Sequence, residues 1–217
     1  MLGILWYIIR LILIVFFPFA LLVRSSVYVH TEYNTIPLIS IGAGVGLTAF
    51  LVFLYVNIAY GFLFKKSSSS NLIKQKLIFS IVVVLVMAVH LVFFISSNNL
   101  KDISLKSGYV ALHPILRLST SMLSKVDKEL VVTDASRERN DYTKMGLPTN
   151  ENSLHFAQND KYAYAIDLRT RGRNPIQIFL IKNYYKLMGF RVLRHIGTAD
   201  HLHVSMYCAA RNRIIQD

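Results

Sequence analysis

Five residues in the last third of the chain could hold a metal ion: His155, Asp167, Asp200, His201 and His203. Imidazole and carboxylate are ligands that zinc takes in hydrolytic sites. Residues two apart in a strand project from the same face, so we expect His201 and His203 to point into one pocket, with Asp200 at the strand's entrance. Three protein ligands would leave the fourth position of a tetrahedral zinc open for water, as in a catalytic zinc site.

Four segments around these residues resemble, in order, the motifs of a known family. They read Val-Thr-Asp-Ala-Ser-Arg at 132–137, Ser-Leu-His at 153–155, Ala-Ile-Asp-Leu at 165–168 and Asp-His-Leu-His-Val at 200–204. The zinc D-Ala-D-Ala carboxypeptidases, with their endolysin and endopeptidase relatives in the lysostaphin and hedgehog-like superfamily, show a Thr-Ser-x-x-Arg segment, a Ser-x-His-x-x-Gly-x-Ala-x-Asp segment and a terminal carboxylate-x-x-His. The resemblance spans residues 113–207 and says nothing about the first half of the chain.

This resemblance implies three zinc ligands: His155, Asp167 and His203. It also implies that Asp200, three positions before the last ligand, is the general base, and that His201 and Arg137 stabilise charge on the substrate. These roles fit together chemically, because zinc lowers the pKa of its bound water toward about 7, a nearby carboxylate accepts the proton, and cations meet the developing oxyanion. Arg137 could also clamp a substrate carboxylate through two parallel hydrogen bonds.

The chain departs from the family pattern between the first histidine and the aspartate. The family places seven positions there, whereas His155 and Asp167 are twelve apart, so extra residues within 158–164 must loop out. The glycine usual in that segment is also missing. Asp160 is a competing ligand by residue type, although the Ala-Ile-Asp-Leu segment favours Asp167, and Arg139 could replace Arg137.

Plainer interpretations of these residues remain open. A lone His-x-His pair on a strand is more often a solvated pair or a buried, hydrogen-bonded one than a metal site. The run Arg169, Arg171 and Arg173 is typical of a solvated basic turn, and it could also attract anionic wall polymers.

Local patterns predict the elements that must position this cluster. We expect helices at 113–125 and 175–188, the second with Pro175 in its first turn and Gly189 as its stop signal. We expect strands at 130–133, 162–168, 190–195 and 201–207, and a polar loop at 138–154. Strands around one clear helix, with short links, indicate a small α+β domain, and the resemblance implies a zinc-peptidase-like fold with an antiparallel sheet.

The first half of the chain has the composition of a membrane protein. Over the whole chain 53% of residues are hydrophobic and the formal charge is +12, with a mean hydropathy of +0.43. Three apolar segments, near 2–23, 37–64 and 77–95, are long enough to cross a bilayer, which takes about 20 helical residues. Trp6, Tyr7 and the lack of a small-x-small cleavage site indicate that the first segment is retained rather than removed as a signal peptide.

Loop charges predict the orientation of these segments. Lys65, Lys66, Lys74 and Lys76 flank the second and third segments, and short basic loops stay in the cytoplasm. The N-terminus is then also cytoplasmic, with Arg10 reaching back to that surface. We therefore divide the chain into a transmembrane region, residues 1–97, and an extracytoplasmic domain, residues 98–217, which in a bacterium faces the periplasm or cell wall.

Other features of the sequence indicate ordinary structural roles. The basic charge comes without a nucleic-acid-binding motif, so we expect no nucleic-acid partner. The single cysteine, Cys208, excludes an intrachain disulfide. The glycines at 42, 44 and 46 lie inside an apolar run and indicate close helix packing rather than a phosphate loop. Asn57 and His90 are typical of hydrogen-bonding groups within a helix bundle.

Together these patterns predict a membrane-anchored zinc peptidase that hydrolyses peptide bonds in peptidoglycan stem peptides. Its partners would be the peptidoglycan peptide and the lipid bilayer. One alternative is a non-catalytic peptidoglycan-binding or envelope-assembly protein that keeps the peptidase fold. Another is a three-span scaffold with partners in a membrane complex, in which peptidase activity only opens the wall locally.

Overall fold

The computed structural model describes the whole chain except residues 1, 65–69, 147, 198–199 and 207–217. It begins with three long helices, α1 (Leu2–Tyr33), α2 (Pro37–Phe64) and α3 (Ser70–Phe93). All three are long and apolar enough to cross a membrane, which confirms three hydrophobic helices near the expected positions. Lys65, Lys66 and Cys208, to which the sequence assigns roles, lie outside the described residues.

Helix α1 continues ten residues beyond the apolar segment expected to end at Val23. Hydroxyl side chains in this extension donate hydrogen bonds to backbone carbonyls four residues earlier. Ser26 donates to the carbonyl of Leu22 at 2.7 Å, and Thr31 donates to that of Val27 at 3.0 Å. Leu22, Val23 and Val27 are fully buried, so packing rather than lipid covers this part of the helix. The apolar run therefore predicted only part of a longer helix, and the end of that run, at Leu22 and Val23, is buried in the core.

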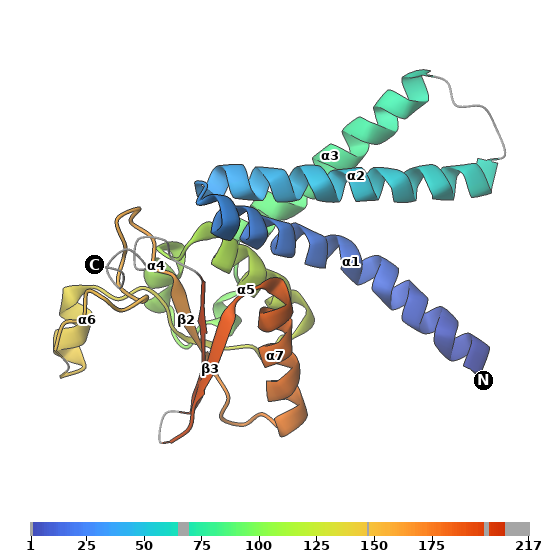
Figure 1. Cartoon of the computed structure of the whole chain (residues 1–217). Helices are drawn as coiled ribbons and strands as arrows, with labels where there is room; N and C mark the ends of the chain where they lie inside the picture. Colours follow the sequence, from blue (N-terminus) through green and yellow to red (C-terminus); the bar gives the residue numbers. More distant parts are fainter. Residues whose placement is uncertain (1, 65–69, 147, 198–199, 207–217) are drawn as a thin grey trace.

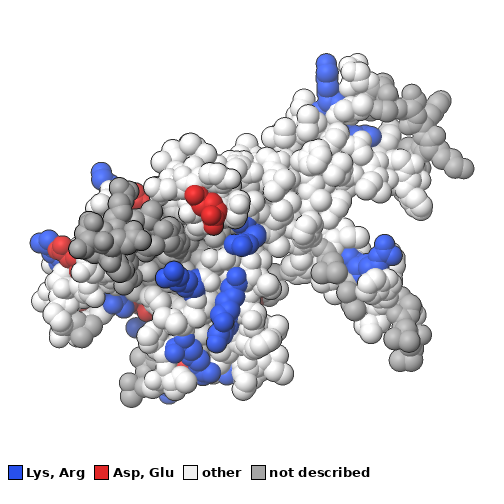
Figure 2. All heavy atoms as spheres, in the orientation of Figure 1, with Lys and Arg blue, Asp and Glu red and all other residues white. Residues whose placement is uncertain are grey.

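The three long helices meet the C-terminal domain at one end. In Figure 1 the end of α1, the start of α2 and the end of α3 lie together beside the domain, while their other ends diverge from it. Figure 2 shows few charged atoms along the middle of these helices and basic groups toward their far ends. Gly44 of α2 packs against α1, because a Cβ atom there would lie 2.7 Å from the carbonyl oxygen of Leu22. This contact agrees with the helix-packing interpretation of Gly44, whereas nothing lies within 4 Å of such an atom at Gly42 or Gly46.

The C-terminal domain combines an antiparallel four-stranded sheet with short helices, as expected for an α+β fold. After a 3₁₀ turn (Ser97–Asn99) its elements are α4 (Leu105–Val110), α5 (Pro114–Val126), β1 (Val132–Asp134), α6 (Arg139–Lys144), β2 (Ala165–Arg169), α7 (Pro175–Met188), β3 (Arg191–His195) and β4 (His201–Ser205). The strand order is β1-β2-β4-β3, and all neighbouring pairs are antiparallel.

The predicted loop at 138–154 is wrong at its start, where α6 forms. Glu138 and Asp141 make a reciprocal capping box around the first turn of this helix, and Tyr142 is its buried residue. A helix of six residues in a polar segment is too short to show a hydrophobic period. The capping residues were therefore the local sequence signal for its start.

The register of the sheet separates a core face from a polar face. Ile166, Leu168, Leu202 and Val204 alternate along β2 and β4 and are fully buried or nearly so. The residues between them, which include Asp167 and His203, point to the opposite face. The hydrophobic pattern of these strands therefore also decides which residues can form a polar site.

Helix α7 is bounded by the signals that the sequence predicts. Asn174 caps its start in a reciprocal capping box, with Pro175 in the first turn, and Gly189 ends it with a positive φ of 98°. Gly189 also lies directly against the guanidinium group of Arg24 on α1, in the space that a Cβ atom would take. The end of α7 is thus a contact between the domain and the first long helix.

The domain and the long helices share one hydrophobic core. The buried cluster joins Leu22 and Val27 of α1 and Leu91 of α3 to residues of α5 and the sheet, among them Leu116 and Val204. Both α1 and α3 contact α5 directly. The division at residue 97 is therefore a change in composition along the chain, while packing is continuous across it.

Candidate metal centre

Three of the expected zinc ligands converge on the polar face of the sheet. The Nε2 atom of His155 lies 3.3 Å from Nδ1 of His203 and 3.3 Å from Oδ1 of Asp167. The third side of this triangle, from His203 Nδ1 to Asp167 Oδ1, measures 2.9 Å. We call His155, Asp167 and His203 the ligand triangle; within the described part of the chain it is the group that could hold a metal ion.

The sheet fixes two corners of the ligand triangle. Asp167 and His203 are directly opposite each other in the pairing of β2 with β4, and side chains of such cross-strand pairs lie close together on one face. Their neighbours in each strand are buried on the other face, so a shift of register by one residue would move both ligands away from the site. The geometry of this pair therefore depends on the core.

The third corner, His155, comes from the loop before β2 and is held by backbone contacts. Its Nδ1 lies 2.6 Å from the carbonyl oxygen of Ala135, which follows β1. Its own carbonyl accepts a hydrogen bond of 2.8 Å from the amide of Arg137, and Tyr164 donates to the carbonyl of Leu154 at 2.7 Å. His155 is buried, so the loop delivers a fixed imidazole to the sheet.

The extra residues between His155 and Asp167 form a turn that leaves the site undisturbed. Gln158 donates to the carbonyl of Tyr162, and Lys161 donates to that of Gln158 with a positive φ of 67°. Asp160 accepts a hydrogen bond of 2.6 Å from the hydroxyl of Tyr164. Asp160 therefore belongs to the turn and not to the ligand triangle, in agreement with the preference for Asp167.

The spacing and residue types of the ligand triangle are compatible with a bound metal ion. Ligand atoms about 2.0–2.2 Å from a tetrahedral zinc are separated from one another by roughly 3.3 Å, close to the 2.9–3.3 Å found here. The carbonyl of Ala135 can accept a hydrogen bond from Nδ1–H of His155, which leaves the lone pair of Nε2 directed at the centre. Direct hydrogen bonds among the three groups would also fit these distances.

Charge in the site is concentrated on Asp167. Burial alone would raise the pKa of this carboxyl group, but hydrogen bonds from His155 and His203 and their positive charge lower it well below its usual range. Burial likewise acts to lower the pKa of His155, and Asp167 outweighs this effect, so the pKa of His155 is raised. Asp167 and His155 therefore each favour the charged form of the other.

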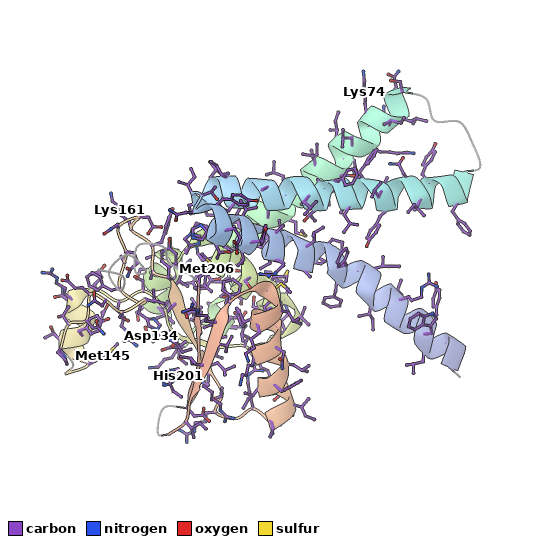
Figure 3. The ribbon with its side chains drawn as sticks, in the orientation of Figure 1. Lys74, Asp134, Met145, Lys161, His201 and Met206 are labelled. Atoms are coloured by element: carbon purple, nitrogen blue, oxygen red, sulfur yellow. The ribbon has the colours of Figure 1, made fainter. Side chains whose placement is uncertain are left out.

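Arg137 and His201, expected to stabilise charge on a substrate, both lie at this site. Nη2 of Arg137 is 3.9 Å from Oδ2 of Asp167, while its Nε donates to Asp134 at 2.7 Å. Burial tends to lower the pKa of Arg137, but the hydrogen bond and charge of Asp134 raise it overall. Nε2 of His201 lies 3.6 Å from Oδ2 of Asp167. Figure 3 shows Asp134 and His201 on the same side of the domain.

His195 is a site residue that the sequence did not single out. It faces His201 across the pairing of β3 with β4, and the two rings stack with centroids 4.9 Å apart and planes 24° from parallel. His195 also meets the ring of His203 edge to face at 6.0 Å. Its position one residue before the Ile-Gly turn was a weak signal, because only the register of β3 brings it to His201.

Asp200, the expected general base, does not join these residues. Its carboxylate makes two hydrogen bonds with the guanidinium group of Arg194, at 3.1 and 2.7 Å. Asp200 lies just before β4, which begins at His201, and its carboxylate is not among the groups that line the pocket. The alternative arginine, Arg139, pairs with Glu151 on the surface, and Arg173 pairs with Asp127.

The site opens into a pocket of about 400 Å³. It is lined by the ligand triangle and by Arg137, His195, Ile196, Gly197 and His201. The pocket thus combines a possible metal position, two further imidazoles and one guanidinium group. This is a set of groups suited to binding and polarising a carbonyl or carboxylate.

In comparisons with known proteins, no family model, no curated protein and no solved structure matches the chain.

Proposed function

We propose that the protein is a membrane-anchored zinc peptidase that hydrolyses peptide bonds in the stem peptides of peptidoglycan. The observation that carries this proposal is the ligand triangle. Its three donor atoms are spaced as zinc ligands can be, and the same three residues line a pocket from which a fourth ligand could approach. The ordered motif resemblance and the expected antiparallel sheet support the same assignment.

Zinc held by His155, Asp167 and His203 would supply a Lewis acid and an activated water molecule. Arg137 stands beside this position with its orientation fixed by Asp134, where it can bind a substrate carboxylate or an oxyanion. The stacked rings of His195 and His201 line the pocket beside the ligand triangle. We assign the acid–base role to this pair, because Asp200 is turned toward Arg194.

The arrangement of the long helices supports the anchoring and its direction. The three helix ends nearest the domain lie together, as three successive crossings would place them (Figure 1). Lys74 is near the far end of α3, away from His201 (Figure 3). With the basic end of the helices in the cytoplasm, the pocket faces the external space in which peptidoglycan is found.

Metal analysis of the purified full chain in detergent tests this function. We expect about one zinc ion per chain in the wild type, and loss of both zinc and muropeptide cleavage in His203→Ala, because a ligand of the triangle is removed. His90→Ala, which alters an exposed histidine of α3, is the matched control and should keep both. Full zinc occupancy in His203→Ala would contradict the assignment.

The ion pair of Asp200 favours a second candidate, a peptidoglycan-binding protein without catalysis. A carboxylate held by Arg194 is not available as a base in the pocket. Such a protein would bind isolated sacculi through the same pocket while leaving muropeptides intact. Cleavage by the wild type that is lost in His201→Ala, with zinc retained, would exclude this candidate.

A further inference from the structure

A second cavity lies between α2 and α3, outside the candidate metal centre. It has a volume of about 580 Å³. Its walls are apolar side chains of the two helices, including Ile41 and Val45 of α2 and Leu85 and Val89 of α3. We call it the interhelix groove. Both helices are long and apolar enough to span a bilayer, and in a bilayer the groove between them would be open to hydrocarbon.

One charged side chain lines the interhelix groove, at the end where the groove meets the domain. Arg117 of α5 is only 6% exposed. Its guanidinium carbon lies 5.8 Å from the centre of the Phe93 ring. No carboxylate of the described residues forms an ion pair with it, and its Nε has no hydrogen-bond partner. The interhelix groove therefore has apolar walls and one cationic group, Arg117, at the end next to the domain.

A buried guanidinium group without an anion is costly, because it has lost its hydration without a replacing charge. Burial accordingly lowers the pKa of Arg117, although the nearby Tyr109 and Tyr162 oppose this effect. An arginine nevertheless keeps its proton in proteins, and its forked geometry matches phosphate oxygens. An anion that enters the groove would relieve this cost.

We propose that the interhelix groove binds an anionic membrane lipid, with its phosphate on Arg117 and a hydrocarbon chain between α2 and α3. A lipid fits both parts of the groove, whereas free phosphate would leave the apolar walls unfilled. The location supports a lipid as well, since Phe93 ends α3 and Pro37 begins α2 beside Arg117. The proposal is independent of the peptidase assignment, because it uses none of the residues of the metal centre.

The headgroup contact is tested by titrating phosphatidylglycerol and phosphatidylcholine into the delipidated full chain, with bound lipid counted by native mass spectrometry. We expect the wild type to hold one phosphatidylglycerol and to prefer it to phosphatidylcholine. Arg117→Gln should weaken phosphatidylglycerol binding by roughly tenfold or more, the effect of losing a charged hydrogen-bond partner. Lys125→Gln, on the same helix but outside the groove, should bind as the wild type does.

The hydrocarbon contact is tested with a matched pair of glycine variants. Gly42 lines the groove, and a Cβ atom there would meet nothing within 4 Å. Gly42→Leu should therefore fill the groove and weaken phosphatidylglycerol binding without disturbing α2. Gly61→Leu, equally open but away from the groove, should have no effect. Inorganic phosphate at millimolar concentration should not displace the lipid.

A stability measurement keeps the proposal testable if Arg117→Gln folds poorly. Arg117→Met removes the buried charge but keeps most of the volume, and such replacements are often neutral or stabilising. We expect phosphatidylglycerol to raise the thermal midpoint of the wild type and not that of Arg117→Met. Equal stabilisation of both proteins, unchanged binding in Arg117→Gln, or displacement by inorganic phosphate would each overturn the proposal.

Discussion

At the scale of single residues, the candidate metal centre is organised by Asp167. This one carboxylate lies within 4 Å of His155, His201, His203 and Arg137. It is buried on the polar face of the sheet, so its charge is poorly screened and governs the protonation of its neighbours. The metal-free site and a zinc-loaded site should therefore respond to pH in opposite ways.

The shifted pKa values predict this pH dependence. The lowered pKa of Asp167 stabilises the metal-free fold above the unfolded value near pH 4, and this contribution is lost as the pH falls through the folded value. The raised pKa of His155 stabilises the fold fully below about pH 6.5, and this is lost as the pH rises through the folded value. The site's contribution in the metal-free protein should thus be largest between about pH 4 and 6.5.

Zinc should reverse the trend, because metal binding requires deprotonated imidazoles. The measurement is the thermal midpoint of the full chain at pH 5 to 8, with a chelator and with zinc. The gain from zinc should grow with pH in the wild type and vanish in His203→Ala. A zinc-induced gain that shrinks as the pH rises would show that the histidines are not ligands.

At the scale of elements, local signals predicted the domain's regular structure well where an apolar pattern accompanied a cap. The bounds of α7 match the prediction in full, because Asn174, Pro175 and Gly189 specify its ends. The cores of β2 and β4 match as well, since buried and polar residues alternate there. Helix α6 and the extension of α1 were missed because capping and tertiary burial, rather than a hydrophobic period, stabilise them.

The contact at the end of α7 gives a prediction at this scale. Gly189→Ala places a Cβ atom both in a left-handed backbone conformation and against Arg24. Gly172, with a φ of 87° and nothing within 4 Å, has only the first of these constraints. Gly172→Ala should cost about 1 kcal/mol through backbone strain, and Gly189→Ala clearly more.

Thermal unfolding of the full chain checks this difference. Combining Gly189→Ala with Arg24→Ala should recover part of the lost stability, because the second change removes the side chain that occupies the space. If both glycine variants lose the same stability, α7 and α1 are not in close contact.

At the scale of the whole molecule, the three long helices and the C-terminal domain form one packing unit. Leu22, Val27 and Leu91 of the long helices are buried with Leu116 and Val204 of the domain. Removal of the helices would expose the apolar side of α5 to water, and exposed patches of this kind lead to aggregation. The three long helices thus also form part of the domain's core.

We therefore expect residues 98–217 to be unstable when produced alone. The fragment should aggregate or lack a cooperative thermal transition, whereas the full chain in detergent should show one. Circular dichroism and size-exclusion chromatography of the two proteins make the comparison. A monomeric fragment that unfolds cooperatively would mean that the shared core contributes little to the fold of the domain.

The sequence alone determined the three apolar helices, the α+β domain and the types of the candidate metal-ligating residues. These depend on composition and on periods of two or 3.6 residues, which act over short distances along the chain. Only the tertiary structure decided that His195 joins the site, that Asp200 turns to Arg194, and that Arg117 is buried with no ion-pair partner among the described residues. Strand register and helix docking bring residues from distant segments together, and neither can be read from local patterns.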